Sequence, residues 1–104
     1  MDVGLSRIEQ IGWMSMDPEM KFDSKGKPYC MVWLCPENPR GSAMFFPWHV
    51  YGSRGEYIAE NFHKGDRIYI EGNPIMMQKY EDGRRIEHFF AIATKVVFLT
   101  QKQG

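Results

Sequence analysis

Apolar and polar positions alternate along most of the chain, and a period of two is typical of strands. The alternation is clearest in residues 29–35 and 44–51, where both alternating sets are rich in apolar and aromatic residues. We expect one set to fill the core, and its members are Cys30, Val32, Leu34, Phe46, Trp48 and Val50. The other set then faces outward, and it holds Tyr29, Met31, Trp33, Phe45, Pro47, His49 and Tyr51. A sheet with apolar residues on both sides has a second surface to cover besides the core.

The remaining pattern predicts further strands and one short helix. Strands are expected at residues 7–14, 20–22, 67–71, 75–80 and 85–99, and a helix at 54–63 with Tyr57, Ile58 and Phe62 on one side. Asp82-Gly83 is a strong hairpin signal and joins the last two strands into a long arm. Pro47 cannot donate to a ladder, which predicts an edge or a bulge there. The order strand, strand, strand, helix, strand, strand predicts an all-β fold, a five-stranded Greek-key barrel of the OB type with the helix between strands 3 and 4.

Length and charge narrow the possible functions. The 104 residues suit one domain, which we take as residues 1–100 with a short tail at 101–104. Thirteen Lys and Arg balance thirteen Asp and Glu, so any electrostatic argument for a partner must be local. The aromatic share of 14% exceeds what a core of this size needs, so some rings are expected at a surface. No segment approaches the ~20 apolar residues of a membrane helix and the N-terminus is unlike a secretory signal, so we expect a cytoplasmic protein without a membrane partner.

Metal binding, a disulfide and catalysis are not expected. Cys30 and Cys35 are five residues apart, which places them on opposite faces of a strand, so we interpret both as small core residues rather than a pair. The three histidines are scattered singly and lack the spacing of metal ligands. The sequence also lacks a motif that places a nucleophile beside a base, a phosphate-binding glycine loop or paired carboxylates. We therefore expect no enzymatic activity, no cofactor and no metal.

Several motifs occur in an order that resembles the bacterial single-stranded DNA-binding protein family. They are IG at 11–12, DPEMKF at 17–22, SKG at 24–26, WHVYG at 48–52, KGDRIYIEG at 64–72 and DG at 82–83. The similarity covers residues 4 to 100, and the combination of these motifs is more specific than any one of them. The resemblance implies an OB-fold homo-oligomer, usually a tetramer, that wraps single-stranded DNA without sequence preference in replication, recombination or repair.

Binding a single strand of any sequence requires flat rings for the bases and cations for the phosphates. From the strand pattern, the outward rings are Trp33, Phe45, His49 and Tyr51, and the arm adds Tyr80 with Lys79, Arg84 and Arg85. The resemblance matches Arg7 and Lys21 to basic positions of the family's DNA surface, Phe45 to a stacking residue that is usually tryptophan, and Tyr51 and Tyr80 to further aromatic sites. The predicted DNA site consists of these ten residues.

Alternatives to this interpretation stay open. Trp33, Phe45 and Tyr51 can instead be buried between subunits, because oligomer contacts are also rich in aromatic residues. His49 can be structural, and Arg84 and Arg85 can simply be solvated. The run GKPYC at 26–30 has some similarity to the primosomal replication protein B type, an OB adaptor that acts as a dimer, mainly through contacts with replication proteins.

The end of the sequence departs from the family pattern. The family normally continues into a flexible tail with an acidic tip that recruits repair and replication enzymes, whereas this sequence ends in TQKQG. Either the tail was never present or it has been removed. If this end is native, we expect a protein that coats DNA without recruiting partners through that tip, as would suit a plasmid, phage or accessory role.

Overall fold

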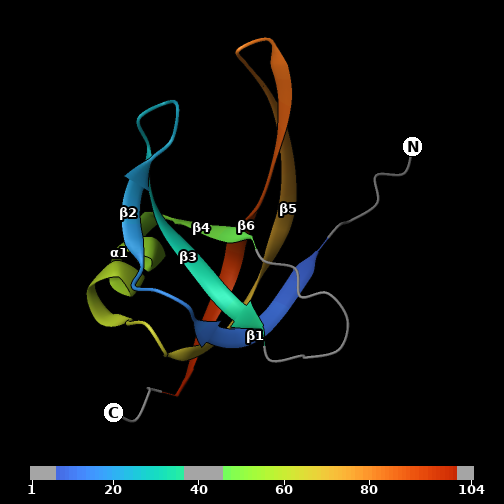
Figure 1. Cartoon of the computed structure of the whole chain (residues 1–104). Coiled ribbons are helices and arrows are strands. Elements are labelled where there is room, and N and C mark those ends of the chain that lie inside the picture. The colour runs from blue at the N-terminus through green and yellow to red at the C-terminus, as the bar shows by residue number, and fades with distance from the viewer. Residues whose placement is uncertain (1–6, 37–45, 101–104) are drawn as a thin grey trace.

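The computed structural model describes residues 7–36 and 46–100, which form six strands and one helix (Figure 1). Along the chain these elements are β1 (Ile8–Met14), β2 (Glu19–Phe22), β3 (Pro28–Pro36), β4 (Pro47–Tyr51), α1 (Gly52–Asn61), β5 (Arg67–Glu81) and β6 (Arg84–Thr100). The strands follow the order β1-β5-β6-β4-β3-β2, and an additional pairing of β1 with β3 closes the sheet. Only β4 and β6 run parallel among the paired strands of the described residues. The result is a barrel with a helix at one side.

β1 and β2 are two halves of one barrel strand, because both pair with β3. Met14 lies opposite Leu34, and Glu19 lies opposite Met31, so the β1–β2 side advances five residues while β3 advances three. The extra residues form a bulge that includes the predicted Asp17-Pro18 turn. Counted this way, the barrel has the predicted five strands, and α1 lies between the third and the fourth.

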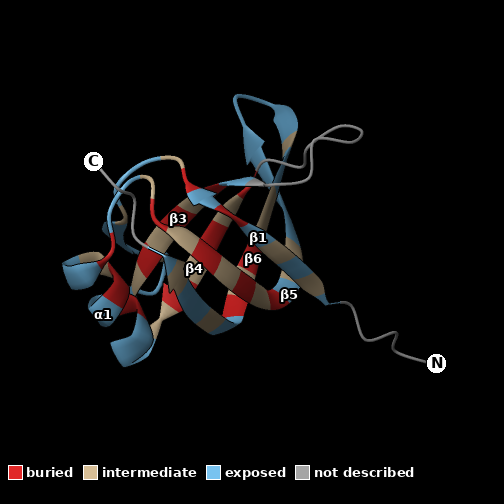
Figure 2. Cartoon of the chain, turned by 90° about the horizontal axis from the view of Figure 1, so that it is seen from below, coloured by how far each residue is buried: buried red, intermediate tan, exposed pale blue. Residues whose placement is uncertain are grey.

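The predicted core is confirmed, and buried residues recur at alternate positions of the strands (Figure 2). All six expected residues are at most 5% exposed, and Met14, Ile58, Phe62, Ile68, Ile70, Ala91 and Ala93 join them. Trp48 is fully buried, and its indole Nε1 donates to Gln10 Oε1 at 2.9 Å, which satisfies the one polar atom of that side chain. Alternation therefore identified the interior without any knowledge of strand pairing.

The two cysteines lie on opposite faces of β3 and are free, as expected. Cys30 is buried in the barrel, but Cys35 is exposed, so its assignment to the core was wrong. The reason is the alternation itself, since Cys35 follows the buried Leu34 and must point outward.

The helix begins and ends two residues earlier than predicted, at Gly52 and Asn61. Gly52 has a φ of +76°, which turns the chain from β4 directly into the helix. Tyr57 is 61% exposed, so the prediction that it shares a buried side with Ile58 and Phe62 was wrong. Adjacent helical residues point about 100° apart, whereas Ile58 and Phe62 are four residues apart and share a face. No helix in the described part of the chain is long and apolar enough to cross a membrane.

A turn after the helix closes one end of the barrel and brings two of the sequence motifs together. The Lys64 N–H donates to Asp17 Oδ1 at 2.8 Å, and the Gly65 N–H donates to the Met14 carbonyl at 2.8 Å. The Met14 N–H in turn donates to the Asp66 carbonyl at 2.8 Å. Gly65 has a φ of +93°, which explains the glycine at this position of the turn. The Asp-Pro and Lys-Gly-Asp motifs are thus two sides of one structural contact.

β5 and β6 extend beyond the barrel as the predicted arm, with Asp82 and Gly83 at positive φ in its turn. The expected break between residues 71 and 75 is absent, since β5 is continuous and only shifts register between Glu71 and Gly72. A Cβ at Gly72 would lie 2.0 Å from the Ile92 carbonyl oxygen, so glycine permits this close approach.

The prediction of an edge or a bulge at Pro47 was wrong. Pro47 is the first residue of β4, which lies between β3 and β6. Its partner on β3 is Trp33, and the pairing of β4 with β6 begins only at Trp48. A proline is tolerated at the first residue of a strand because the ladder does not yet need its missing N–H.

Candidate functional site

A groove of about 510 Å³ lies between the β2–β3 turn and the lower part of the arm. Both segments project from the same end of the barrel, and the outer face of β3 and β4 lies between them (Figure 1). The turn contributes Asp23 and Lys25 to the lining, and the barrel face contributes Tyr29, His49 and Tyr51. The arm contributes Met77, Lys79, His88 and Phe90. Rings and lysines from three separate parts of the sequence therefore meet in one depression.

Strand register decides which of the predicted residues reach this groove. Residues opposite each other in antiparallel strands share a face. Lys21 lies opposite Tyr29, and Tyr29 lies opposite Tyr51, so these three form one row across β2, β3 and β4. Tyr29 and Tyr51 line the groove, and Lys21 lies outside its lining. Trp33 lies opposite Pro47 on the same face, two rows further along, and is half-buried outside the groove lining.

Three rings form a continuous column across β3, β4 and β6. The ring of His49 stacks on Tyr29 with centroids 4.2 Å apart and on Phe90 with centroids 4.1 Å apart. The interplanar angles are 21° and 15°, so both faces of the imidazole are covered. A base can therefore stack on the column only at its ends, on Tyr29 or on Phe90. His49 acts as a spacer that holds these two rings.

The surroundings of His49 keep its imidazole neutral. Its Nδ1 is buried and makes no hydrogen bond. Burial lowers the pKa of His49 to about 4, because the charged form would lose its hydration between two rings. At neutral pH this side chain cannot supply the positive charge that a phosphate attracts.

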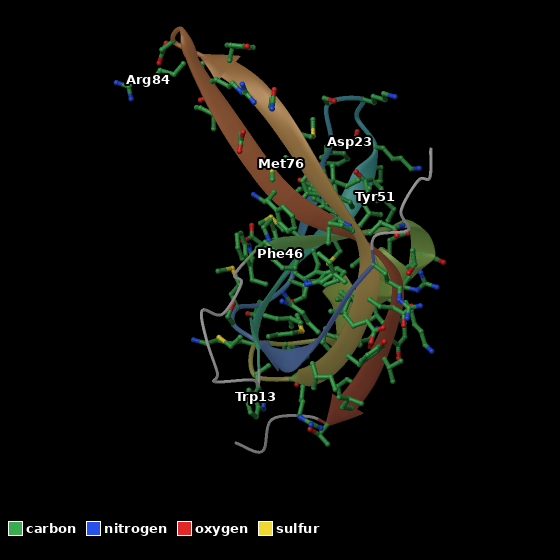
Figure 3. The ribbon with its side chains drawn as sticks, turned by 90° about the vertical axis from the view of Figure 1, so that its right-hand side faces the viewer. Trp13, Asp23, Phe46, Tyr51, Met76 and Arg84 are labelled. Carbon is green, nitrogen blue, oxygen red and sulfur yellow. The ribbon has the colours of Figure 1, made fainter. Side chains whose placement is uncertain are left out.

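Tyr51 lies next to the column and is tied to the β2–β3 turn. Its ring centroid is 5.5 Å from that of Tyr29, and the Lys27 ammonium lies 5.2 Å from the ring centre. Its hydroxyl donates to Asp23 Oδ2 at 3.3 Å. Burial raises the pKa of Tyr51, and the neighbouring Asp23 carboxylate raises it further. Figure 3 shows Asp23 and Tyr51 side by side near the base of the arm.

The five predicted cations differ in their surroundings. Lys79 lines the groove, and Arg84 lies at the tip of the arm, well away from it (Figure 3). The other three pair with glutamates: Lys21 with Glu19 at 3.6 Å, Arg85 with Glu87 at 3.4 Å, and Arg7 with Glu9 at 2.8 Å. Exposed ion pairs of this kind contribute about 0–1 kcal/mol, so a phosphate can replace the carboxylate at little cost.

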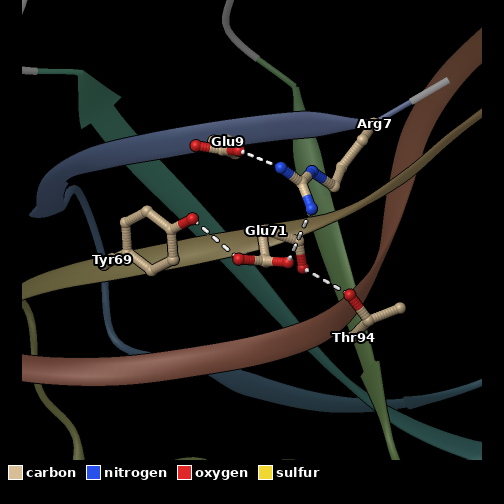
Figure 4. A network of polar contacts seen from close by, with 5 residues as sticks. All are labelled: Arg7, Glu9, Tyr69, Glu71 and Thr94. Carbon is tan, nitrogen blue, oxygen red and sulfur yellow. Dashed lines mark hydrogen bonds and ion pairs between the residues drawn. The ribbon is translucent and has the colours of Figure 1, made fainter.

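Arg7 belongs to a separate polar network on β1 and β5 (Figure 4). Its guanidinium also lies 3.8 Å from Glu71, whose carboxylate accepts a hydrogen bond from the Tyr69 hydroxyl at 2.7 Å. That hydrogen bond has the largest effect on the pKa of Tyr69, which desolvation and the charges of Glu71 and Glu9 help to raise to about 12. The Thr94 hydroxyl donates to the Glu71 carbonyl at 3.3 Å, which connects β6 to the same network. The structure therefore does not bring Arg7 to the groove.

Of the remaining predicted residues, Tyr80 is 76% exposed on the arm beyond the groove lining, and Phe45 lies outside the described residues. The sequence interpretation missed Tyr29, Lys25 and Phe90 as groove residues. Tyr29 belongs to the same outward set as Trp33, so the alternation contained its signal. Phe90 had no comparable signal, because its place depends on the pairing of β6 with β4. Among the described residues, no group of three or more His, Cys, Asp or Glu could hold a metal ion.

Comparison with known proteins gives a consistent result for the whole barrel. The family model described as the single-strand binding protein family matches residues 5–98. A protein of Fusobacterium nucleatum subsp. nucleatum named single-stranded DNA-binding protein is 32% identical over 95 residues, covering 84% of this chain. The chain spans 62% of the length of that relative.

Solved structures share the fold at low sequence identity. The mitochondrial single-stranded DNA-binding protein of S. cerevisiae superposes with a TM-score of 0.77 at 15% identity, covering 95% of this chain and 99% of the other. The Plasmodium falciparum SSB in complex with ssDNA gives a TM-score of 0.76 at 17% identity, covering 95% and 98%. Both similarities support the barrel architecture described above.

Proposed function

The chain belongs to the single-strand binding protein family, and on this premise we propose that it binds single-stranded DNA without sequence preference and without catalysis. Residues 1–100 serve as the binding domain. The bound strand is protected during replication, recombination or repair, at the nucleoid in the cytoplasm, where replication or repair proteins are further partners.

The observation that carries this proposal is the combination of rings and lysines in the groove. Tyr29, Tyr51 and Phe90 offer ring faces, and Lys25 and Lys79 line the same space. Every base has a π-face, and stacking contributes about 1–3 kcal/mol per base without reading its identity. The lysines supply positive charge for the backbone phosphates. The stacked bases of a duplex do not offer their faces to these rings, so the groove suits an unpaired strand.

The neutral net charge makes binding depend on these local cations. Each phosphate contact to a single strand lowers the slope of log K against log salt by about 0.7. Two groove lysines therefore predict a slope of roughly −1.4. The slope becomes steeper, that is more negative, if Lys21 exchanges Glu19 for a phosphate.

Titration of a fluorescently labelled oligo-dT with the protein, followed by anisotropy, tests the proposal. We expect saturable, salt-sensitive binding that duplex of equal length competes for poorly. Tyr51→Ala should weaken binding about tenfold or more, from the loss of one stacking ring. Tyr57→Ala is the matched control, because Tyr57 is an exposed tyrosine on α1 that does not line the groove. Equal affinity for duplex, or equal effects of the two substitutions, would refute the proposal.

We further propose that the chain forms a homo-oligomer, either a dimer or a tetramer, through the outer face of β1, β5 and β6. Ile11, Tyr69 and Val97 lie opposite one another across these three strands, and the exposed Trp13 lies further along β1 on the same face. Light scattering after gel filtration measures the mass, and Ile11→Glu should lower it, from a dimer to the monomer or from a tetramer to a smaller species. Loss of DNA binding in Tyr51→Ala with an intact oligomer supports stacking, whereas dissociation into monomers favours the alternative in which this ring lies between subunits. A dimer that binds no DNA would favour the adaptor function.

A further inference from the structure

We propose that Asp23 is a positioning residue for DNA binding, whose carboxylate holds the Tyr51 ring and the β2–β3 turn in the arrangement that faces the groove. This inference rests on the proposed function and adds a residue to it that does not itself attract DNA. A carboxylate in the lining of a groove for a polyanion otherwise has only a cost, since it repels phosphate.

The contacts of Asp23 support this role. Its Oδ1 accepts hydrogen bonds from the backbone N–H groups of Lys25 at 2.9 Å and Lys27 at 2.8 Å. Its Oδ2 accepts the hydroxyl of Tyr51, which is 28 residues away on β4. One side chain thus both shapes the turn and fastens it to the aromatic face of the barrel.

The backbone reinforces the same arrangement. The Asp23 N–H donates to the Lys27 carbonyl at 2.9 Å, and the Gly26 N–H donates to the Asp23 carbonyl at 2.9 Å. The turn so formed places Lys25 in the groove lining and the Lys27 ammonium 5.2 Å from the centre of the Tyr51 ring. Without the carboxylate, the turn loses its side-chain hydrogen bond to β4, and the Tyr51 hydroxyl loses its acceptor.

Asp23 is ionised at neutral pH. The hydrogen bond from the Lys27 N–H lowers the pKa of its carboxyl, and the Lys25 N–H, the Tyr51 hydroxyl and the Lys27 charge act in the same direction against desolvation. Its charge and its hydrogen bonds therefore have opposite effects on DNA affinity. Removing the charge alone should strengthen binding, and removing the hydrogen bonds should weaken it.

Comparison of Asp23→Asn with Asp23→Ala separates the two effects, because both variants lose the same charge. Asparagine keeps the Oδ1 acceptor for the turn, and its amide can donate to the Tyr51 oxygen, whereas alanine keeps neither. We expect Asp23→Asn to bind oligo-dT at least as tightly as the wild type and Asp23→Ala to bind about tenfold more weakly than Asp23→Asn. Equal affinities of the two variants would overturn the proposal.

A matched carboxylate provides the control. Glu19 lies on β2 and pairs with Lys21 at 3.6 Å. Glu19→Gln and Glu19→Ala remove the same charge from the same edge of the barrel, and we expect them to have equal affinities. A tenfold difference between these two variants as well would show that any truncation of this edge weakens binding, and it would overturn the specific role of Asp23.

A double-mutant cycle tests the link between Asp23 and Tyr51 directly. Tyr51→Phe keeps the ring and removes only the hydroxyl that donates to Asp23. The factor by which Asp23→Ala weakens oligo-dT binding should be smaller in the Tyr51→Phe background, because the hydrogen bond between the two side chains is already absent there. An equal decrease in oligo-dT affinity in both backgrounds would overturn the proposal. Failure of the wild type to bind oligo-dT would instead refute the proposed function itself.

Discussion

Acidification from pH 7.5 to pH 5 is expected to destabilise the protein through His49. The imidazole lies between Tyr29 and Phe90 with centroids 4.2 and 4.1 Å away, and its buried Nδ1 makes no hydrogen bond. Protonation would place a charge between two rings with no acceptor for the added proton. The folded state therefore resists protonation, and the pKa of His49 falls from 6.5 to about 4.

The direction and the size of the effect follow from this difference in pKa. Since the folded-state pKa lies below the unfolded value, the unfolded chain binds the proton more tightly. The stabilisation is complete above pH 6.5 and is lost as the pH falls toward 4. If the whole difference in pKa between the two states contributed, the free energy of unfolding would be about 2 kcal/mol lower at pH 5 than at pH 7.5. Because the ring is only half-buried, water screens part of it, and we expect about 1 to 2 kcal/mol.

Urea denaturation of the wild type and His49→Phe at both pH values measures this effect. Phenylalanine keeps a flat ring in the column and does not titrate, while the exposed His63 and His88 remain in both proteins. We expect the wild type to lose about 1 to 2 kcal/mol more than the variant between pH 7.5 and pH 5. Equal losses in the two proteins would show that the imidazole is not held in its neutral form.

Three further predictions concern packing, reactivity and charge. Helix propensity alone predicts that Gly55→Ala stabilises the protein by about 1 kcal/mol. The added Cβ would, however, lie 2.1 Å from the Val50 carbonyl oxygen. We therefore expect urea denaturation to show a free energy of unfolding that is lower by about 2 kcal/mol. Cys35 should react with a thiol reagent in the native protein. Cys30 is buried and its pKa is raised to about 11, so it should react only after unfolding. Mass spectrometry counts the labels attached in each state. Lys79→Gln should weaken oligo-dT binding in anisotropy titrations. It should also make the slope of log K against log salt less negative by about 0.7.

Each of these predictions has a comparison within the chain. A Cβ at Gly83 meets nothing within 4 Å, so Gly83→Ala should cost only the strain of its positive φ, about 1 kcal/mol. A Gly55→Ala variant more stable than the wild type would contradict the close contact. Labelling of both cysteines at equal rates in the native protein would contradict the burial of Cys30. Arg7→Gln should change the salt slope less than Lys79→Gln, because Arg7 lies in the network with Glu9 and Glu71.

Much of the fold was predictable because its signals are local. Period-two alternation identified the buried set of β3 and β4, since a strand turns successive side chains to opposite faces whatever its partners are. Asp82-Gly83 predicted the turn of the arm because few other residues tolerate positive φ. Local signals were weaker at Tyr57, where the face of the helix depends on how α1 packs against the barrel.

The strands, the interior and the family resemblance could all be predicted from patterns along the sequence, but which outward residues meet depends on how the strands pair in the folded chain. The column joins residues 29, 49 and 90, and the hydrogen bond that fastens the β2–β3 turn to β4 joins residues 23 and 51. These contacts depend on how β3 pairs with β4 and β4 with β6, and alternation specifies the face of a residue but not its partner on the next strand. Arg7 and Lys79 are both plain cations in the sequence, and only their distant neighbours, Glu71 for one and the rings of the groove for the other, distinguish them.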